Sequence, residues 1–168
     1  MSHILVIYAS KRGATEEVAR VIAGQLHEDG HSVDLHSADV APAPGGYDAV
    51  VVGGSLYIGR WHSDARRYLR RNAGALRTLP LAVFALGPLR LTAKDVADSR
   101  AQLDATLAKF PELTPDRVAV FGGAINPDAL HFPFNHMAAG DARDWPAIRA
   151  WADDLAAVFV RAAVAPRG

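Results

Sequence analysis

The sequence contains no cysteine and no long hydrophobic run, and its positive and negative charges cancel. Without cysteine the chain can form neither disulfides nor a thiolate nucleophile nor a cysteine-ligated iron–sulfur cluster. No apolar stretch approaches the roughly 20 residues of a membrane-spanning helix, and the chain enters a predicted strand almost at its start, so we expect a cytoplasmic protein with no transmembrane segment. Lys and Arg number 18 against 18 Asp and Glu, which gives no electrostatic case for nucleic acid as a partner.

Several motifs of nucleotide, hydrolytic and phosphorylation sites are also missing. The chain has no Gly-x-x-x-x-Gly-Lys-Ser/Thr loop for a triphosphate, no Gly-x-Gly-x-x-Gly after the first strand for a dinucleotide, and no Gly-x-Ser-x-Gly for a nucleophilic serine. The seven histidines show no metal-ligand spacing, so we expect no metal site. Where a phosphoryl-receiver domain needs carboxylates, this chain has Ser10 and Lys11 after the first strand and Gly53 and Gly54 after the third, which excludes that class. No side chain stands out as a catalytic residue.

Five apolar runs alternate with amphipathic segments along the chain. Strands are predicted at residues 3–9, 49–52, 81–86 and 118–121, because these runs are short and apolar, and at 32–36, where Val33 and Leu35 alternate with polar residues. Helices are predicted at 14–28 and from residues 63, 92 and 144 onward, where apolar side chains recur with helical spacing. Such alternation predicts an α/β fold, a three-layer doubly wound sandwich around a parallel five-stranded sheet. The length of 168 residues, with no linker or repeat, predicts a single domain over residues 1–168.

The stretch between the first strand and the first helix combines hydroxyl side chains with a glycine. Its members are Ser10, Lys11, Arg12, Gly13, Ala14 and Thr15. The first turn of a helix has N–H groups without intrahelical acceptors, and the helix dipole adds partial positive charge, so this turn is suited to an anion. Ser10 and Thr15 add hydroxyl donors, and Gly13 permits a positive φ. We interpret the turn as a site for one phosphate; the alternative is an ordinary turn in which Thr15 caps the helix.

The loops after the third and fourth strands are expected beside this turn, because the carboxyl ends of parallel strands meet at the edge where doubly wound folds bind ligands. The loop that begins at Gly53 offers Tyr57 and Trp61 as aromatic faces for a planar ring, unless both simply pack on neighbouring helices. Its glycines are expected where backbone approaches a flat ligand closely. The loop at 87–90 offers main-chain donors and acceptors to the polar edge of such a ring. His62 is more typical of a helix cap than of a catalyst.

These loops resemble those of the flavodoxin family, and the resemblance covers nearly the whole chain. Residues 10–15 resemble the Ser/Thr-x-Thr-Gly-x-Thr phosphate loop of that family, with Arg12 where the family usually has Thr, and Gly54-Ser55-Leu56-Tyr57 resembles its second loop. Three stretches are similar to the menaquinone-dependent, flavodoxin-type protoporphyrinogen IX dehydrogenases and related bacterial flavodoxin-domain proteins. They are Gly-Ser-Leu-Tyr-Ile-Gly-Arg-Trp-His at 54–62, Phe-Gly-Gly-Ala at 121–124 and Gly-Asp-Ala-Arg-Asp-Trp at 140–145.

The resemblance implies a five-stranded parallel sheet of order 2-1-3-4-5 and FMN as the cofactor. By position, residues 10–15 would hold the FMN phosphate, and the second and third loops would flank the isoalloxazine ring. The residues implied there are Ser55, Leu56, Tyr57, Ile58, Gly59, Leu86, Gly87, Pro88 and Leu89. Trp61 is a further candidate for ring binding, as an aromatic face of the second loop.

Three functions remain open from the sequence. The first is an FMN-dependent oxidoreductase that passes electrons between a small organic or porphyrin-like substrate and an acceptor such as a quinone. The neutral composition and the aromatic, histidine-bearing segment at 126–140 favour this function. The second is a one-electron carrier that serves partner proteins, and the third is a flavin-free binding module. The oligomeric state is also open, with a homodimer as one alternative.

Overall fold

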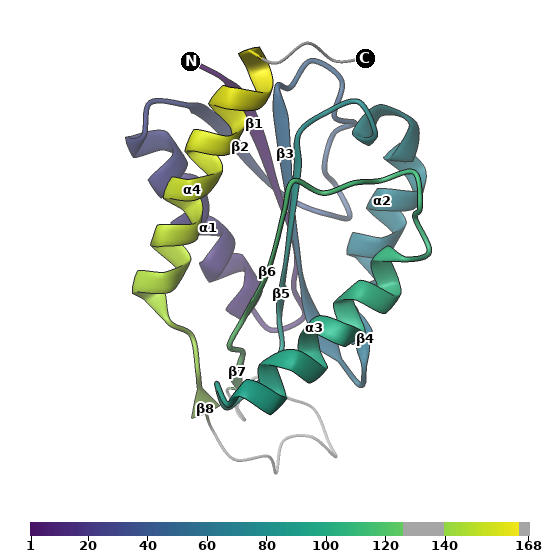
Figure 1. The fold of residues 1–168 in the computed structure, drawn as a ribbon, viewed down its shortest axis with the longest axis vertical. Helices are drawn as coiled ribbons and strands as arrows, with labels where there is room; N and C mark the ends of the chain where they lie inside the picture. Colours follow the sequence, from purple (N-terminus) through teal and green to yellow (C-terminus); the bar gives the residue numbers. More distant parts are fainter. Residues whose placement is uncertain (126–139, 165–168) are drawn as a thin grey trace.

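The computed structural model describes residues 1–125 and 140–164, and it has the expected α/β architecture (Figure 1). Five parallel strands form the central sheet: β1 (His3–Ala9), β2 (Ser32–Ser37), β3 (Ala49–Tyr57), β5 (Leu81–Leu86) and β6 (Arg117–Phe121). Their order is β2-β1-β3-β5-β6, which is the order 2-1-3-4-5 when only these parallel strands are numbered. The predictions of fold class and strand order are therefore confirmed.

Three short strands are additional to the prediction. β4 (Arg60–Trp61) pairs antiparallel with the end of β3, and β7 (Ala124–Ile125) pairs antiparallel with β8 (Gly140–Asp141) in a separate small sheet. Each has only two residues, which is too short to produce a periodic pattern in the sequence. All three lie toward the lower end of the molecule in Figure 1.

Helices cover both faces of the central sheet (Figure 1). α1 (Ala14–Glu28) and α4 (Trp145–Val164) lie on one face, and α2 (Ser63–Leu76) and α3 (Ala93–Leu107) lie on the other. Within β1, Ile4 and Val6 pack toward α1 and α4, whereas Leu5 and Ile7 pack toward α2 and α3. Because successive strand side chains point to opposite faces and both faces are covered, such a strand is a continuous apolar run. None of the helices in the described part of the chain is long and apolar enough to cross a membrane.

The helix starts differ in a way that matters for the site. The side chains of His62, Thr92 and Asp144 each accept a hydrogen bond of 3.0–3.1 Å from a backbone N–H two or three residues later, at the starts of α2, α3 and α4. These bonds satisfy N–H groups that a helix start otherwise leaves open. At the start of α1, Gly13 has a φ of 91° and no side chain caps the helix. The helix that follows the predicted phosphate loop thus has an open first turn.

β3 continues through Gly53 and Gly54, so the prediction that a loop begins at Gly53 is wrong. Gly53 pairs with Phe84, and a Cβ at Gly53 would lie 1.9 Å from Phe84 Cζ. At Gly54 a Cβ would lie 2.8 Å from Trp61 Nε1, which donates a 3.0 Å hydrogen bond to the Gly54 carbonyl oxygen. The close approach that both glycines permit is made by buried aromatic side chains of the protein itself.

Candidate functional site

Three corners of the chain meet at one edge of the sheet, the lower edge in Figure 1. The first corner is residues 10–15, from the end of β1 into α1. The second corner is residues 55–60, the last part of β3 and its turn into β4, and the third is residues 87–92 after β5. β3 lies between β1 and β5 and is parallel to both, so the three carboxyl ends are adjacent. The structure therefore brings together the loops that the sequence analysis singled out.

The first corner forms an open helix start around a buried hydroxyl group. Ser10 Oγ accepts a 2.9 Å hydrogen bond from the Gly13 N–H, which folds the corner back on itself. The N–H groups of Ala14, Thr15 and Glu16 lie in the first turn of α1, where helix geometry leaves them without intrahelical acceptors. Thr15 is 1% exposed, and its Oγ1 has no hydrogen-bond partner among the described residues. A buried hydroxyl without a partner is costly, so a ligand oxygen that reached this atom would supply a missing hydrogen bond.

The start of α1 has no side-chain cap, and Lys11 connects the first corner to the second. Gly13 is the N-cap residue of α1 and no side chain caps the helix, so the alternative in which Thr15 is the cap is wrong. Lys11 and Arg12 are both exposed. Lys11 Nζ lies 4.4 Å from the centroid of the Tyr57 ring, and this cation–π contact joins the two corners.

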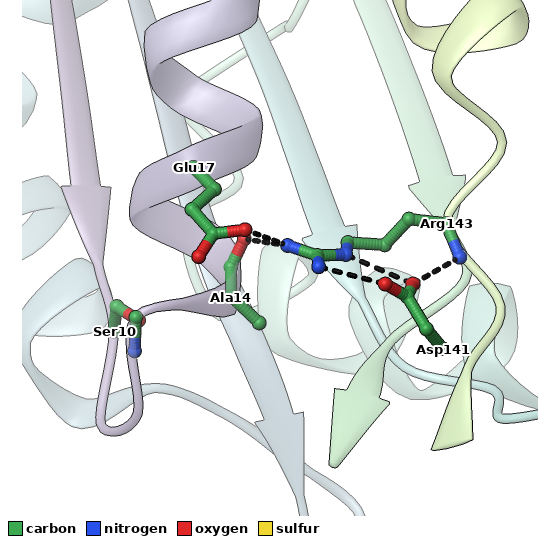
Figure 2. A network of polar contacts seen from close by, with 6 residues as sticks. Ser10, Ala14, Glu17, Asp141 and Arg143 are labelled. Carbon is green, nitrogen blue, oxygen red and sulfur yellow. Dashed lines mark hydrogen bonds and ion pairs between the residues drawn. The ribbon is translucent and has the colours of Figure 1, made fainter. Parts of the chain in front are cut away.

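Two carboxylates lie in the first turn of α1, and each is held by an arginine. Glu16 accepts a 2.7 Å hydrogen bond from Arg20 Nη2 and a 3.1 Å bond from the Tyr8 hydroxyl, and the bond from Arg20 holds the pKa of Glu16 below its usual value. Glu17 accepts a 2.5 Å bond from Arg143 Nη1 (Figure 2). Because both negative charges are paired with cations, the positive end of the α1 dipole stays available to an anion.

The second corner is a tight turn with exposed side chains. Tyr57 is 38% exposed and Ile58 is 77% exposed. Ile58 and Gly59 both have positive φ, at 48° and 73°, which is the pattern of a type I′ hairpin turn. Trp61 is fully buried in the core beneath α2, so the expectation that its ring offers a face to a ligand is wrong. Its ring supports the corner from inside, through the hydrogen bond to β3.

Ile58 is strained by this turn, which predicts a stabilising substitution. The left-handed region costs a residue with a Cβ about 1–2 kcal/mol, and asparagine adopts it several times more often than a β-branched residue. We expect Ile58→Asn to raise the free energy of unfolding of the protein by about 1 kcal/mol, as measured by urea unfolding. Ile58→Val keeps the branched side chain and should give no such gain. A loss of stability in Ile58→Asn would show that the isoleucine side chain packs in a way that outweighs the strain.

A groove of about 480 Å³ lies between the second and third corners, within the range typical of small-molecule sites. Leu56, Ile58 and Gly59 line it from the second corner, Gly87, Pro88 and Leu89 from the third, and Arg90, Asp95, Asp98, Ser99 and Gln102 from the third corner and α3. The backbone of the third corner is fixed, because the Gly87 N–H donates to Phe121 O at 3.1 Å and the Gly123 N–H donates to Pro88 O at 2.8 Å. The groove combines apolar side chains from the second and third corners with a larger polar part near α3.

Six of the ten residues predicted for ring binding line this groove, whereas Ser55, Tyr57, Leu86 and Trp61 do not. Leu86 is 3% exposed and packs in the core on the side of α1 and α4, so its side chain is not available to a ligand. Trp61 is fully buried, so its ring is not available to a ligand either. Ser55 is half-buried at the end of β3, where its carbonyl oxygen accepts a 2.9 Å hydrogen bond from the His62 N–H.

Among the described residues around the groove, no acid–base pair stands out. His62 Nδ1 accepts a 3.0 Å hydrogen bond from the Asp64 N–H as the cap of α2, and burial lowers the pKa of His62. Arg90 Nε lies 3.4 Å from Asp95 Oδ2 at the start of α3. Within residues 1–125 and 140–164, no three His, Asp or Glu side chains are grouped so as to hold a metal ion. The site as described is suited to binding and orienting a ligand.

Sequence reasoning assigned no role to Arg143, which the structure places beside the first corner (Figure 2). Its side chain is only 11% exposed and contacts α1 from the connection between β8 and α4. The one signal in the sequence is its position within the Gly-Asp-Ala-Arg-Asp-Trp stretch. The predicted segment at 126–140, by contrast, lies outside the described residues except for Gly140.

Comparisons with known proteins show the family and the fold. The model of a family described as a flavodoxin domain matches residues 5–137. Protoporphyrinogen IX dehydrogenase [quinone] of Escherichia coli (strain K12) is 29% identical over 126 residues, which cover 72% of this chain and 68% of that protein.

Among solved structures, a flavodoxin from the domain Archaea has a TM-score of 0.60 at 13% identity and covers 94% of this chain and 99% of its own. A short-chain flavodoxin associated with a bacterial microcompartment has a TM-score of 0.62 at 16% identity, with 97% and 99% covered. The rubredoxin:oxygen oxidoreductase of Desulfovibrio gigas has a TM-score of 0.61 at 16% identity, with 98% of this chain and 38% of that chain covered. These structural similarities show the fold.

Proposed function

The chain belongs to the flavodoxin-domain family, and from this premise we propose that it binds FMN and works as an oxidoreductase. The observation that carries the proposal is the buried Thr15 hydroxyl, which has no partner among the described residues and lies in the open first turn of α1. A phosphate oxygen would satisfy that hydroxyl together with the first-turn N–H groups.

The residues of the three corners fit the two ends of FMN. The phosphate would be held by Ser10, Lys11, Arg12, Gly13, Ala14 and Thr15. The isoalloxazine ring would be bound by Ser55, Leu56, Tyr57, Ile58 and Gly59 of the second corner and by Gly87, Pro88 and Leu89 of the third. Leu86 and Trp61 are left out of the proposed site because their side chains are buried in the core.

Bound FMN would supply the transfer of electrons or hydride, so the protein does not need a catalytic acid or base of its own. Leu56, Pro88 and Leu89 would exclude water from one part of the ring, and the fixed backbone of the third corner would orient its polar edge. The exposed Tyr57 and Ile58 leave the rim of the groove open to a second molecule. A substrate or acceptor could therefore reach the cofactor from the side of the second corner.

The proposed substrate is a small organic or porphyrin-like molecule, and the proposed acceptor is a quinone. The support is the similarity to an enzyme named protoporphyrinogen IX dehydrogenase [quinone], together with the zero formal net charge of this chain. The FMN-loaded protein is expected to oxidise protoporphyrinogen IX anaerobically with menadione as acceptor, at a rate that saturates with both compounds. The measurement is porphyrin fluorescence against time, with heat-denatured protein and free FMN as controls.

A one-electron carrier would behave differently in the same assay. It would exchange electrons with a partner reductase and would give no porphyrin product with menadione or with artificial dyes. Inactivity with every quinone and dye tested, from a protein that holds FMN, would overturn the enzyme proposal and favour the carrier.

A further inference from the structure

We infer that Arg143 is a positioning residue for phosphate binding, which holds the Glu17 carboxylate and the first turn of α1 so that the turn can accept an anion. The inference rests on the proposed function and deepens it. It assigns a part of the cofactor site to the end of the chain, although the three corners all lie within the first 92 residues.

The geometry around Arg143 is that of a clamp between two distant segments (Figure 2). Its Nε and Nη2 donate to the two carboxylate oxygens of Asp141 at 3.0 and 2.8 Å, which fixes the guanidinium on its own segment. Its Nη1 donates to Glu17 Oε2 at 2.5 Å and to the Ala14 carbonyl oxygen at 3.4 Å, across sequence separations of 126 and 129 residues. The guanidinium also lies 4.8 Å from the centroid of the Trp145 ring. Arg143 therefore fixes the start of α1 to the β8–α4 connection.

The backbone beside Arg143 is itself closely fitted to the sheet. The Ala142 N–H donates a 2.9 Å hydrogen bond to Gly123 O, and a Cβ at Gly122 would lie 2.1 Å from the Ala142 carbonyl oxygen. The clamp is thus built on a fixed support, which is what a positioning role requires.

Arg143 is not placed to be a phosphate ligand itself. A guanidinium has five N–H donors, and the four hydrogen bonds above leave one of them. Its charge is already shared between Asp141 and Glu17, and those two carboxylates raise its pKa. Its effect on an anion would therefore come through Glu17, a first-turn residue of α1 whose carboxylate is turned toward Arg143 (Figure 2). Without Arg143 that carboxylate would be an unpaired negative charge next to the phosphate.

The test compares FMN with riboflavin, which lacks the phosphate. We expect Arg143→Gln to weaken FMN binding about tenfold, because members of one ion-pair network are strongly coupled, and to leave riboflavin binding within about twofold. Glu17→Gln in the same chain should restore most of the FMN affinity, because the uncompensated charge is gone. Arg143→Lys keeps the positive charge but loses the planar arrangement of N–H donors, so its FMN affinity should lie between those of the wild type and Arg143→Gln. Arg143→Lys replaces Arg143→Gln in the test if Arg143→Gln does not fold. Arg149→Gln, at an exposed arginine of α4, is the matched control and should bind as the wild type does.

Equal losses of FMN and riboflavin affinity in Arg143→Gln, or no loss of either, would overturn the inference, as would a failure of Glu17→Gln to restore FMN binding.

A second readout needs no flavin. The Glu17 N–H, which bonds to Gly13 O at 3.1 Å and closes the first turn, should exchange with deuterium faster in Arg143→Gln than in Arg149→Gln. An unchanged rate of deuterium exchange at the Glu17 N–H would overturn the inference whether or not the protein binds FMN. If the wild type does not bind FMN but this exchange is faster in Arg143→Gln, the proposed function is wrong and the role of Arg143 in holding the first turn of α1 is supported.

Discussion

Replacing Thr15 by valine is expected to stabilise the flavin-free protein and to weaken its binding of FMN. Valine has the shape of threonine without the hydroxyl, and the Thr15 hydroxyl is buried without a partner among the described residues. A buried polar group left unsatisfied costs about 1–3 kcal/mol, so its removal should raise the free energy of unfolding by about 1 kcal/mol or more. A hydrogen bond to a charged group is worth about 1.5–3 kcal/mol, so FMN affinity should fall about 10- to 100-fold.

The two effects are measured on the same preparation, by urea unfolding of the flavin-free protein and by quenching of FMN fluorescence. Thr15→Ser is the control, because it keeps the hydroxyl and loses a buried methyl group; it should lose about 1 kcal/mol of stability and keep most of the FMN affinity. Riboflavin affinity should be nearly the same in all three proteins. If Thr15→Val instead destabilises the flavin-free protein and binds FMN normally, the hydroxyl serves the fold and not the phosphate.

Replacing Gly53 by alanine is expected to be among the most destabilising single substitutions in the sheet. The added Cβ would lie 1.9 Å from Phe84 Cζ and 2.2 Å from Phe84 Cε1. Phe84 is fully buried, with ring centroids 6.0 Å from Phe121 and 5.9 Å from Trp151, so its ring has no free space to enter. Overpacking of this kind costs about 1–3 kcal/mol and occasionally more, and we expect a loss near the upper end, about 3 kcal/mol, in urea unfolding.

A double mutant identifies the cause of that loss. In a Phe84→Leu background, Gly53→Ala should cost at least about 1.5 kcal/mol less than in the wild type, because contacting residues are coupled on this scale. Gly24→Ala is the matched control: Gly24 lies inside α1 with nothing within 4 Å of its Cβ position, so alanine there should stabilise the protein by about 0.5–1 kcal/mol. If Gly53→Ala behaved like Gly24→Ala, the close packing of Phe84 on β3 would be wrong.

The elements that the sequence predicts best are those defined by local pattern. β1 and α1 begin and end at the predicted residues, because an uninterrupted apolar run and a helical apolar stripe are visible without knowledge of partners. The end of α1 is equally local: Gly30 has a φ of 95°, and its N–H bonds to His27 O as in a Schellman motif. The parallel sheet with helices on both faces follows from the alternation of such elements.

The features that the sequence does not predict depend on partners that are remote in the chain. Gly53 and Gly54 have the composition of a turn, yet they continue β3 in its pairing with β1 and β5, and Phe84 and Trp61 fill the space that their side chains would take. Trp61 follows a glycine-rich stretch, as a ligand-facing aromatic would, but it is buried. Arg143 meets Glu17 across 126 residues, and no local pattern indicates that contact. For the candidate site, the sequence therefore locates the three corners, and the structure decides which of their side chains a ligand can reach.

The central claim is that the first turn of α1 binds a phosphate group, and calorimetric titration of the flavin-free protein with FMN and with riboflavin tests it most directly. We predict binding of one FMN per chain with the appearance of a bound-flavin absorption spectrum, and riboflavin binding at least about tenfold weaker because it forgoes the charged hydrogen bonds of the first corner. Equal affinity for the two flavins would contradict the phosphate site. If neither FMN nor riboflavin bound, the proposal that the chain is a flavoprotein would be wrong, and the flavin-free binding module would be the remaining function.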